Sequence, residues 1–250
     1  MSPILEWGLD LLHMNETLRK RPGQTLGGWP KEPGVSWFRF FLIWWAVEAV
    51  VRWFGVFAFP ADVRESMWVN LSLLFVAAPL AWAMTRQFAG TPLMPTFPAP
   101  SYGKARAVAE GLAFGAIAFA LIFPLQWVDA RLFGSQPLPA LENNWGTLAL
   151  LLAVNGVWYP VFEELAWRGW LQRSLNVTYG IGWSLAITSV LFTLKHALVD
   201  MSPGRLLTIL GIGLCVGIAH RRGGLYSAIT SHIVLNIGAS TLAWLSRHPG

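Results

Sequence analysis

Long apolar runs dominate this 250-residue chain and limit what it can fold into. A membrane-spanning helix needs about 20 mostly apolar residues, and about seven runs meet this requirement. The runs cover residues 37–59, 66–84, 107–128, 146–170, 181–198, 205–219 and 225–245. Charged residues make up only 12% of the chain, which is about half their share in a typical soluble domain. The sequence therefore predicts an all-α, polytopic transmembrane helix bundle.

Proline and glycine mark the connections between these runs. Residues 90–102 contain four prolines and residues 135–144 contain two, so neither segment is expected to be helical throughout. Turn signals also occur at 202–204 and 221–224. The run at 205–219 is short and rich in glycine, which favours close helix packing, and whether it crosses the whole membrane stays open.

The N-terminal residues 1–34 have a different character from the rest of the chain. They lack the apolar core of a signal peptide, and their apolar side chains recur at helical spacing. This pattern predicts a cytoplasmic or interfacial segment with a short amphipathic helix on the membrane surface. Residues 35–250 are expected to form a single transmembrane domain, because no internal repeat or second composition is evident.

The basic residues indicate contact with lipid rather than with nucleic acid. The formal net charge is +5, and most Lys and Arg residues lie between apolar runs, where they meet lipid head groups. With a cytoplasmic N-terminus, most of these residues fall on the cytoplasmic side, as the positive-inside rule requires. The outer side then holds Arg64, Arg131, Lys195, Arg205 and Arg247. We therefore expect a multi-pass protein, in a bacterium located in the plasma (inner) membrane, with its C-terminus outside.

Ionisable residues inside the apolar runs need a chemical reason, because each costs about 2.5–3.5 kcal/mol on insertion scales. In the run 146–170, Glu164 and Arg168 are four residues apart and can form an ion pair on one helix face. Glu163 lies about 100° around the same helix. It is therefore the freer carboxylate and the one suited to act as a general base.

Two further pairs repeat the four-residue spacing. Phe192 and His196 share a helix face, and so do His232 and Asn236. A single intramembrane His or Asn is often only a helix–helix hydrogen bond. Two glutamates, two histidines and an asparagine on three separate runs are harder to explain in that way, and they favour a functional site.

Other intramembrane polar residues have structural or solvated interpretations. Glu48 and Arg52 are four residues apart in the first run and are expected to be a purely structural ion pair. Asp129 lies close to the end of a run, where we expect it to be solvated.

Three motifs, in this order, suggest a known family. They are Glu163-Glu164-x-x-x-Arg168, Phe192-x-x-x-His196 and His232-x-x-x-Asn236. Their order and spacing resemble the signature of the CPBP family, which includes the type II CAAX prenyl endopeptidases and the bacterial Abi proteins. The resemblance covers residues 157–239. It implies an intramembrane protease with its catalytic core at residues 146–246.

The resemblance also implies a role for each motif residue. Glu163 would be the general base that activates a water molecule, and His196 would share this activation. His232 and Asn236 would stabilise the oxyanion, a step in which one donor is worth about 3–4 kcal/mol. The residues implied to support or line the site are Glu164, Arg168 and Phe192. The implied substrate is a membrane-anchored protein or peptide, which need not be prenylated.

Three alternatives stay open. A zinc-dependent protease would use Glu163, His196 and His232 as ligands, since carboxylate and imidazole both bind zinc. We favour no metal or other cofactor, because the sequence lacks a His-Glu-x-x-His motif. A proton-coupled transporter also places Glu and His in the membrane, although the sequence shows no internal symmetry. A non-catalytic scaffold or immunity protein is the third alternative, and the complete motifs argue against it.

Overall fold

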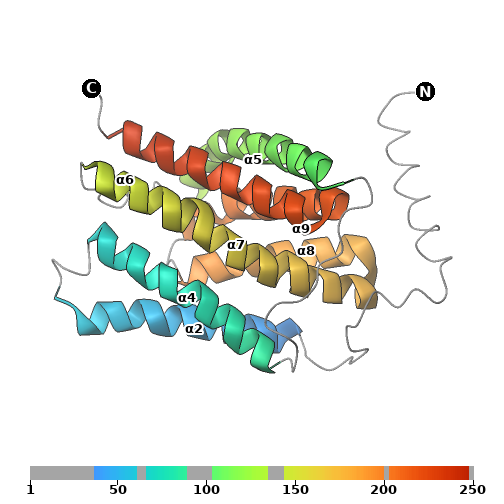
Figure 1. Ribbon diagram of the computed structural model, residues 1–250, viewed down its shortest axis with the longest axis horizontal. Helices are drawn as coiled ribbons and strands as arrows, with labels where there is room; N and C mark the ends of the chain where they lie inside the picture. The colour runs from blue at the N-terminus through green and yellow to red at the C-terminus, as the bar shows by residue number, and fades with distance from the viewer. Residues whose placement is uncertain (1–36, 61–65, 89–102, 135–143, 200–202, 248–250) are drawn as a thin grey trace. The chain divides into compact units, whose positions relative to one another are not determined.

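A computed structural model describes residues 37–60, 66–88, 103–134, 144–199 and 203–247 (Figure 1). All of them belong to one compact unit that spans residues 36–250. The described residues contain helices and connecting segments but no β-strand, so the prediction of an all-α fold is confirmed. The amphipathic helix predicted within residues 1–34 lies outside the described residues.

The helices follow the apolar runs of the sequence. In chain order they are α2 (Trp37–Ala58), α4 (Met67–Phe88), α5 (Lys104–Phe133), α6 (Trp145–Leu151), η1 (Leu152–Trp158), α7 (Tyr159–Glu164), η2 (Leu165–Gln172), α8 (Arg173–Val199), η3 (Pro203–Arg205) and α9 (Leu206–Leu245). The elements η1 and η2 are π-helical and lie directly before and after α7. Short π-helical segments are frequent at functional sites, and α7 carries both motif glutamates.

Among the described residues, four helical stretches are long and apolar enough to cross a membrane. They are Met67–Gln87, Lys104–Phe133, Trp145–Val199 and Leu206–Leu245. The helix α2 occupies the first predicted run but is not among these four. These helices are those of an integral membrane protein with several spans, while the number seven remains a prediction.

Two glycines interrupt the last two of these stretches. The backbone leaves the helical conformation at Gly180 in α8 and at Gly224 in α9. Their φ angles are 78° and 67°, a region that glycine enters without steric cost. Both breaks lie at connections that the sequence predicts, so α8 and α9 each consist of two helical parts.

The helix α5 packs closely along α9 (Figure 1). A Cβ atom added to Gly115 of α5 would lie 2.7 Å from Cβ of Val234 and 2.8 Å from the carbonyl oxygen of Ser231. Gly111, one turn earlier, is equally close to α9. Small residues four positions apart allow this approach between helix backbones in membranes. The contact fixes the part of α9 that carries His232.

We expect Gly115→Ala to lower the free energy of unfolding by about 1–3 kcal/mol, the usual cost of overpacking. The new methyl group meets the backbone oxygen of Ser231, which cannot move without shifting α9. Thermal unfolding in detergent measures the effect. Gly182→Ala is the matched control, because Gly182 is helical and no atom lies within 4 Å of its added Cβ. Equal losses of stability in the two variants would contradict the prediction.

Asp129 is fully buried, so the expectation of a solvated position was wrong. Its carboxylate accepts hydrogen bonds from the backbone N–H groups of Leu207 (2.9 Å) and Thr208 (2.8 Å). It also accepts one from the Thr208 hydroxyl at 2.7 Å. These contacts satisfy N–H groups that the start of α9 leaves without helical partners, and a negative charge is favourable at that end. The sequence did not reveal this role, because the carboxylate that caps α9 comes from α5, a helix far from the start of α9 in the sequence.

Candidate active site

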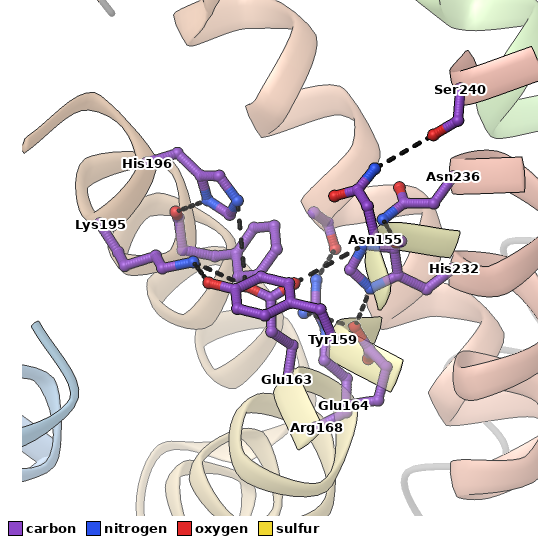
Figure 2. Close-up of polar contacts among 12 residues, drawn as sticks. Asn155, Tyr159, Glu163, Glu164, Arg168, Lys195, His196, His232, Asn236 and Ser240 are labelled. Atoms are coloured by element: carbon purple, nitrogen blue, oxygen red, sulfur yellow. Dashed lines mark hydrogen bonds and ion pairs between the residues drawn. The ribbon is translucent and has the colours of Figure 1, made fainter. Parts of the chain in front are cut away.

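The structure brings Glu163, His196 and His232 together from three helical elements (Figure 2). Oε1 of Glu163 lies 3.9 Å from Nε2 of His196, and Oε2 lies 3.8 Å from Nε2 of His232. Both distances are longer than a direct hydrogen bond, and polar groups at this separation are often bridged by water. Glu163 itself is 1% exposed. One buried carboxylate therefore faces two imidazole rings.

Glu164 forms the predicted ion pair with Arg168, at 3.1 Å, and both side chains are fully buried. Oε1 of Glu164 also lies 2.7 Å from Nδ1 of His232. Arg168 in addition donates a hydrogen bond to the carbonyl oxygen of Gly213, at 3.2 Å, in the glycine-rich part of α9. Glu164 therefore orients the His232 ring, while Arg168 balances the charge of Glu164 and ties η2 to α9.

The partners of each ring indicate which nitrogen carries the proton. Nδ1 of His196 lies 2.8 Å from the carbonyl oxygen of Phe192, and Nδ1 of His232 faces the Glu164 carboxylate. Both partners only accept hydrogen bonds, so Nδ1 is the donor in each ring. A neutral ring then presents Nε2 as an acceptor. His232 can donate through Nε2 only when its ring carries a second proton.

Phe192 lines the site between the two histidines. Its ring centroid is 4.4 Å from that of His196 and 6.2 Å from that of His232. The guanidinium carbon of Arg168 lies 4.5 Å from the centre of the same ring. Phe192 is 1% exposed, so its position between these groups is fixed by packing.

Asn236 lies on the His232 side of the site, away from His196 (Figure 2). Its side-chain amide donates a hydrogen bond to the carbonyl oxygen of Asn155, at 2.9 Å. The Asn155 side chain in turn donates one to the Ser240 hydroxyl, at 3.1 Å. These contacts hold α9 against η1. An amide nitrogen carries two hydrogens, so the bond to Asn155 accounts for one of them.

Lys195 is a site residue that the sequence reasoning missed. It was assigned to the outer side as a loop charge, which was wrong, because Lys195 is 1% exposed and lies within the site. Its Nζ atom lies 2.7 Å from Oε1 of Glu163 and 2.7 Å from the hydroxyl of Tyr159. The signal that could have found it is a lysine inside an apolar run, directly before the motif histidine.

Glu48 also reaches this site, although it was predicted to be a purely structural partner of Arg52. One oxygen of the buried Glu48 carboxylate lies 3.2 Å from Nζ of Lys195. The other accepts hydrogen bonds from the Tyr159 hydroxyl and from Nε1 of Trp44. The helix α2 therefore contributes a carboxylate to the site, and treating Glu48 only as half of a local pair was wrong.

The zinc alternative requires Glu163, His196 and His232 to act as ligands. In the described part of the chain, no group of three or more His, Cys, Asp or Glu side chains is arranged to hold a metal ion. Lys195 also places an ammonium group 2.7 Å from Glu163, where it would repel a divalent cation. The residues as placed do not fit zinc.

Comparisons with known proteins agree with the motifs. Residues 145–238 match the family described as type II CAAX prenyl endopeptidase Rce1-like. The matched region begins with α6, ends within α9 and contains all three motifs. A search of curated proteins and a search of solved structures each found no match. Residues 145–238 are therefore a domain of the Rce1-like type II CAAX prenyl endopeptidase (CPBP/Abi) family, which is a family of proteases.

Proposed function

We propose that this protein is an intramembrane endopeptidase in which Glu163 is the general base. The observation that carries the proposal is the buried Glu163 carboxylate, which faces the Nε2 atoms of His196 and His232 at 3.9 and 3.8 Å. A general base must lie within reach of the proton that it removes, directly or through one water. The family implies peptide-bond hydrolysis, and the role of each residue is our proposal.

In the proposed reaction, a water molecule donates one hydrogen bond to Glu163 and the other to Nε2 of His196. Glu163 takes the water proton as the oxygen attacks the peptide carbonyl carbon, which gives a tetrahedral oxyanion. The C–N bond then breaks, and the proton held by Glu163 passes to the leaving amine. The first products are a carboxylic acid and an amine. The second water proton then passes from the acid to the amine, which gives a carboxylate and an ammonium, and Glu163 is again a carboxylate.

The oxyanion needs hydrogen-bond donors at the place where its charge develops. We assign this role to Nε2 of His232, in the doubly protonated form of the ring, and to the second amide hydrogen of Asn236. Glu164 supports the role of His232, because it accepts the Nδ1 hydrogen at 2.7 Å. Arg168 supports it in turn, since it pairs with Glu164 at 3.1 Å and holds that side chain in place.

We also propose seven membrane spans with a cytoplasmic N-terminus. The count treats the stretch Trp145–Val199 and the helix α9 as two spans each, because the backbone breaks at Gly180 and Gly224. Lys195 no longer counts as an outer charge, since it is buried, which increases the excess of basic residues on the cytoplasmic side. A C-terminal alkaline phosphatase fusion tests the arrangement in a bacterial host: activity is expected, and an inactive fusion of full abundance would contradict it.

Cleavage of two internally quenched CAAX peptides by the protein in proteoliposomes tests the proposed function. The peptides have the same sequence, and only one is farnesylated. We expect the wild-type protein to cleave at least one of them, Glu163→Gln to cleave neither, and a chelator to leave the rate unchanged. If the wild-type protein cleaves neither peptide, or Glu163→Gln cleaves as fast as wild type, the proposal is wrong.

The same proteoliposomes distinguish the remaining alternatives. Loss of cleavage after chelation, with recovery on adding zinc, would replace the metal-free reaction with the zinc-dependent one. Proton uptake that depends on Glu163, without cleavage, would favour the transporter.

A further inference from the structure

We propose that Lys195 is a positioning residue for Glu163, an inference that rests on the proposed role of Glu163 as general base. Lys195 directly precedes His196 on α8, and its ammonium lies 2.7 Å from Oε1 of Glu163 (Figure 2). Both side chains are buried, with exposed fractions of 2% and 1%. At this distance in a buried site, a charge-assisted hydrogen bond is short and directional. The orientation of the Glu163 carboxylate therefore depends on Lys195.

The ammonium is itself held from three sides. Besides Glu163, it contacts the Tyr159 hydroxyl at 2.7 Å and Oε2 of Glu48 at 3.2 Å. Glu163 and Tyr159 accept hydrogen bonds from the ammonium, and Glu48 adds an ion pair. The Tyr159 hydroxyl also donates to Glu48. Lys195 is thus anchored by side chains from α2 and α7 before it reaches Glu163.

This anchoring gives the two oxygens of Glu163 different surroundings. Oε1 is bonded by Lys195 and lies on the side of His196, whereas Oε2 faces Nε2 of His232 at 3.8 Å. The bond at Oε1 prevents the carboxylate from rotating about its terminal C–C bond. The bond therefore holds the carboxylate in the orientation in which Glu163 takes the proton of the water that it shares with His196, and Lys195 does this without touching the substrate.

The alternative role for Lys195 is to stabilise the fold without positioning Glu163. Lys195 lies between two buried carboxylates, and removing it takes a cation away from both, which is strongly destabilising. Loss of activity in Lys195→Met alone would therefore not distinguish positioning from stability. The double variant Glu48→Gln/Lys195→Met removes one of the two uncompensated charges and permits the comparison with Glu48→Gln alone.

The experiment measures kcat and KM for the internally quenched farnesylated CAAX peptide in proteoliposomes. Relative to Glu48→Gln, we expect the double variant to have a kcat lower by about 10–100-fold, the scale of a small misplacement of a reacting group. We expect KM to stay the same, and tryptophan fluorescence and size-exclusion chromatography to show a folded protein. Tyr159→Phe keeps every charge and removes one anchor of Lys195, so it should also lower kcat and not KM.

Either of two results would overturn the inference. If the double variant keeps the kcat of Glu48→Gln, Lys195 only balances the charge of Glu48. If the loss lies in KM, Lys195 acts in substrate binding. If the double variant does not fold, an unchanged kcat in Tyr159→Phe would also overturn the inference that Lys195 positions Glu163.

The Glu163→Gln variant, measured in parallel, separates this inference from the proposed function. If Glu163→Gln cleaves the peptide normally, the proposed function fails, and the inference fails with it. If Glu163→Gln is inactive while the Lys195 variants keep their kcat, only the positioning role of Lys195 is wrong.

Discussion

Glu163→Gln is expected to lower kcat for peptide cleavage by about 10²–10⁴-fold, which is the usual contribution of a general base. Glutamine keeps the size and shape of the side chain, but its amide oxygen is too weakly basic to take a proton from water. The site is buried, and Glu163 is 1% exposed, so bulk water does not provide a substitute base. KM should change little, because the carboxylate acts on the attacking water and not on the substrate backbone.

The control for this prediction is Glu110→Gln on α5. Glu110 lies four residues after Arg106, pairs with it at 3.6 Å, and its side chain is 18% exposed. The substitution makes the same chemical change outside the site, so we expect it to keep the wild-type kcat. A comparable loss at both positions would point to a general effect on the membrane domain, and would argue against a specific role for Glu163.

The helices were predictable because a bilayer imposes a length and a composition on each of them. An apolar run of about 20 residues has few other ways to satisfy its backbone hydrogen bonds in lipid. Prolines and glycines then located connections, including the break at Gly224, while the break at Gly180 lies between the predicted runs 146–170 and 181–198. What the sequence did not reveal is which helices pack together, since lipid and protein interior are similarly apolar.

In the site, too, contacts within one helix were predictable from the sequence, whereas contacts between helices were not. The ion pair of Glu164 with Arg168 was predictable, because four residues in one helix determine the distance. Lys195 and Glu48 were misassigned, because their partnership joins α8 to α2 through packing that no local pattern encodes. The insertion cost of each charge was readable from the sequence. It showed that every buried charge needs a partner, but not which partner it has.

Arg168→Ala is expected to lower the free energy of unfolding by about 3–5 kcal/mol, the cost of removing one partner of a buried ion pair. Arg168 is fully buried, lies 3.1 Å from Glu164 and donates a hydrogen bond to the carbonyl oxygen of Gly213. Its removal leaves the buried Glu164 side chain beside His232 without the guanidinium that pairs with it. Thermal unfolding in detergent, followed by tryptophan fluorescence, measures the loss.

The chain provides a matched control in Arg106→Ala. The pair of Arg106 with Glu110 has the same four-residue spacing, but the Arg106 side chain is 65% exposed. Exposed pairs contribute about 0–1 kcal/mol. We therefore expect Arg106→Ala to lower the free energy of unfolding much less than Arg168→Ala. The double variant Glu164→Gln/Arg168→Met removes both charges together and should recover part of the stability lost in Arg168→Ala, because it leaves no unpaired carboxylate. If it is no more stable than Arg168→Ala, the hydrogen bond to Gly213 and the packing of Arg168 matter more than its charge, and the charge-balance argument for Glu164 is wrong.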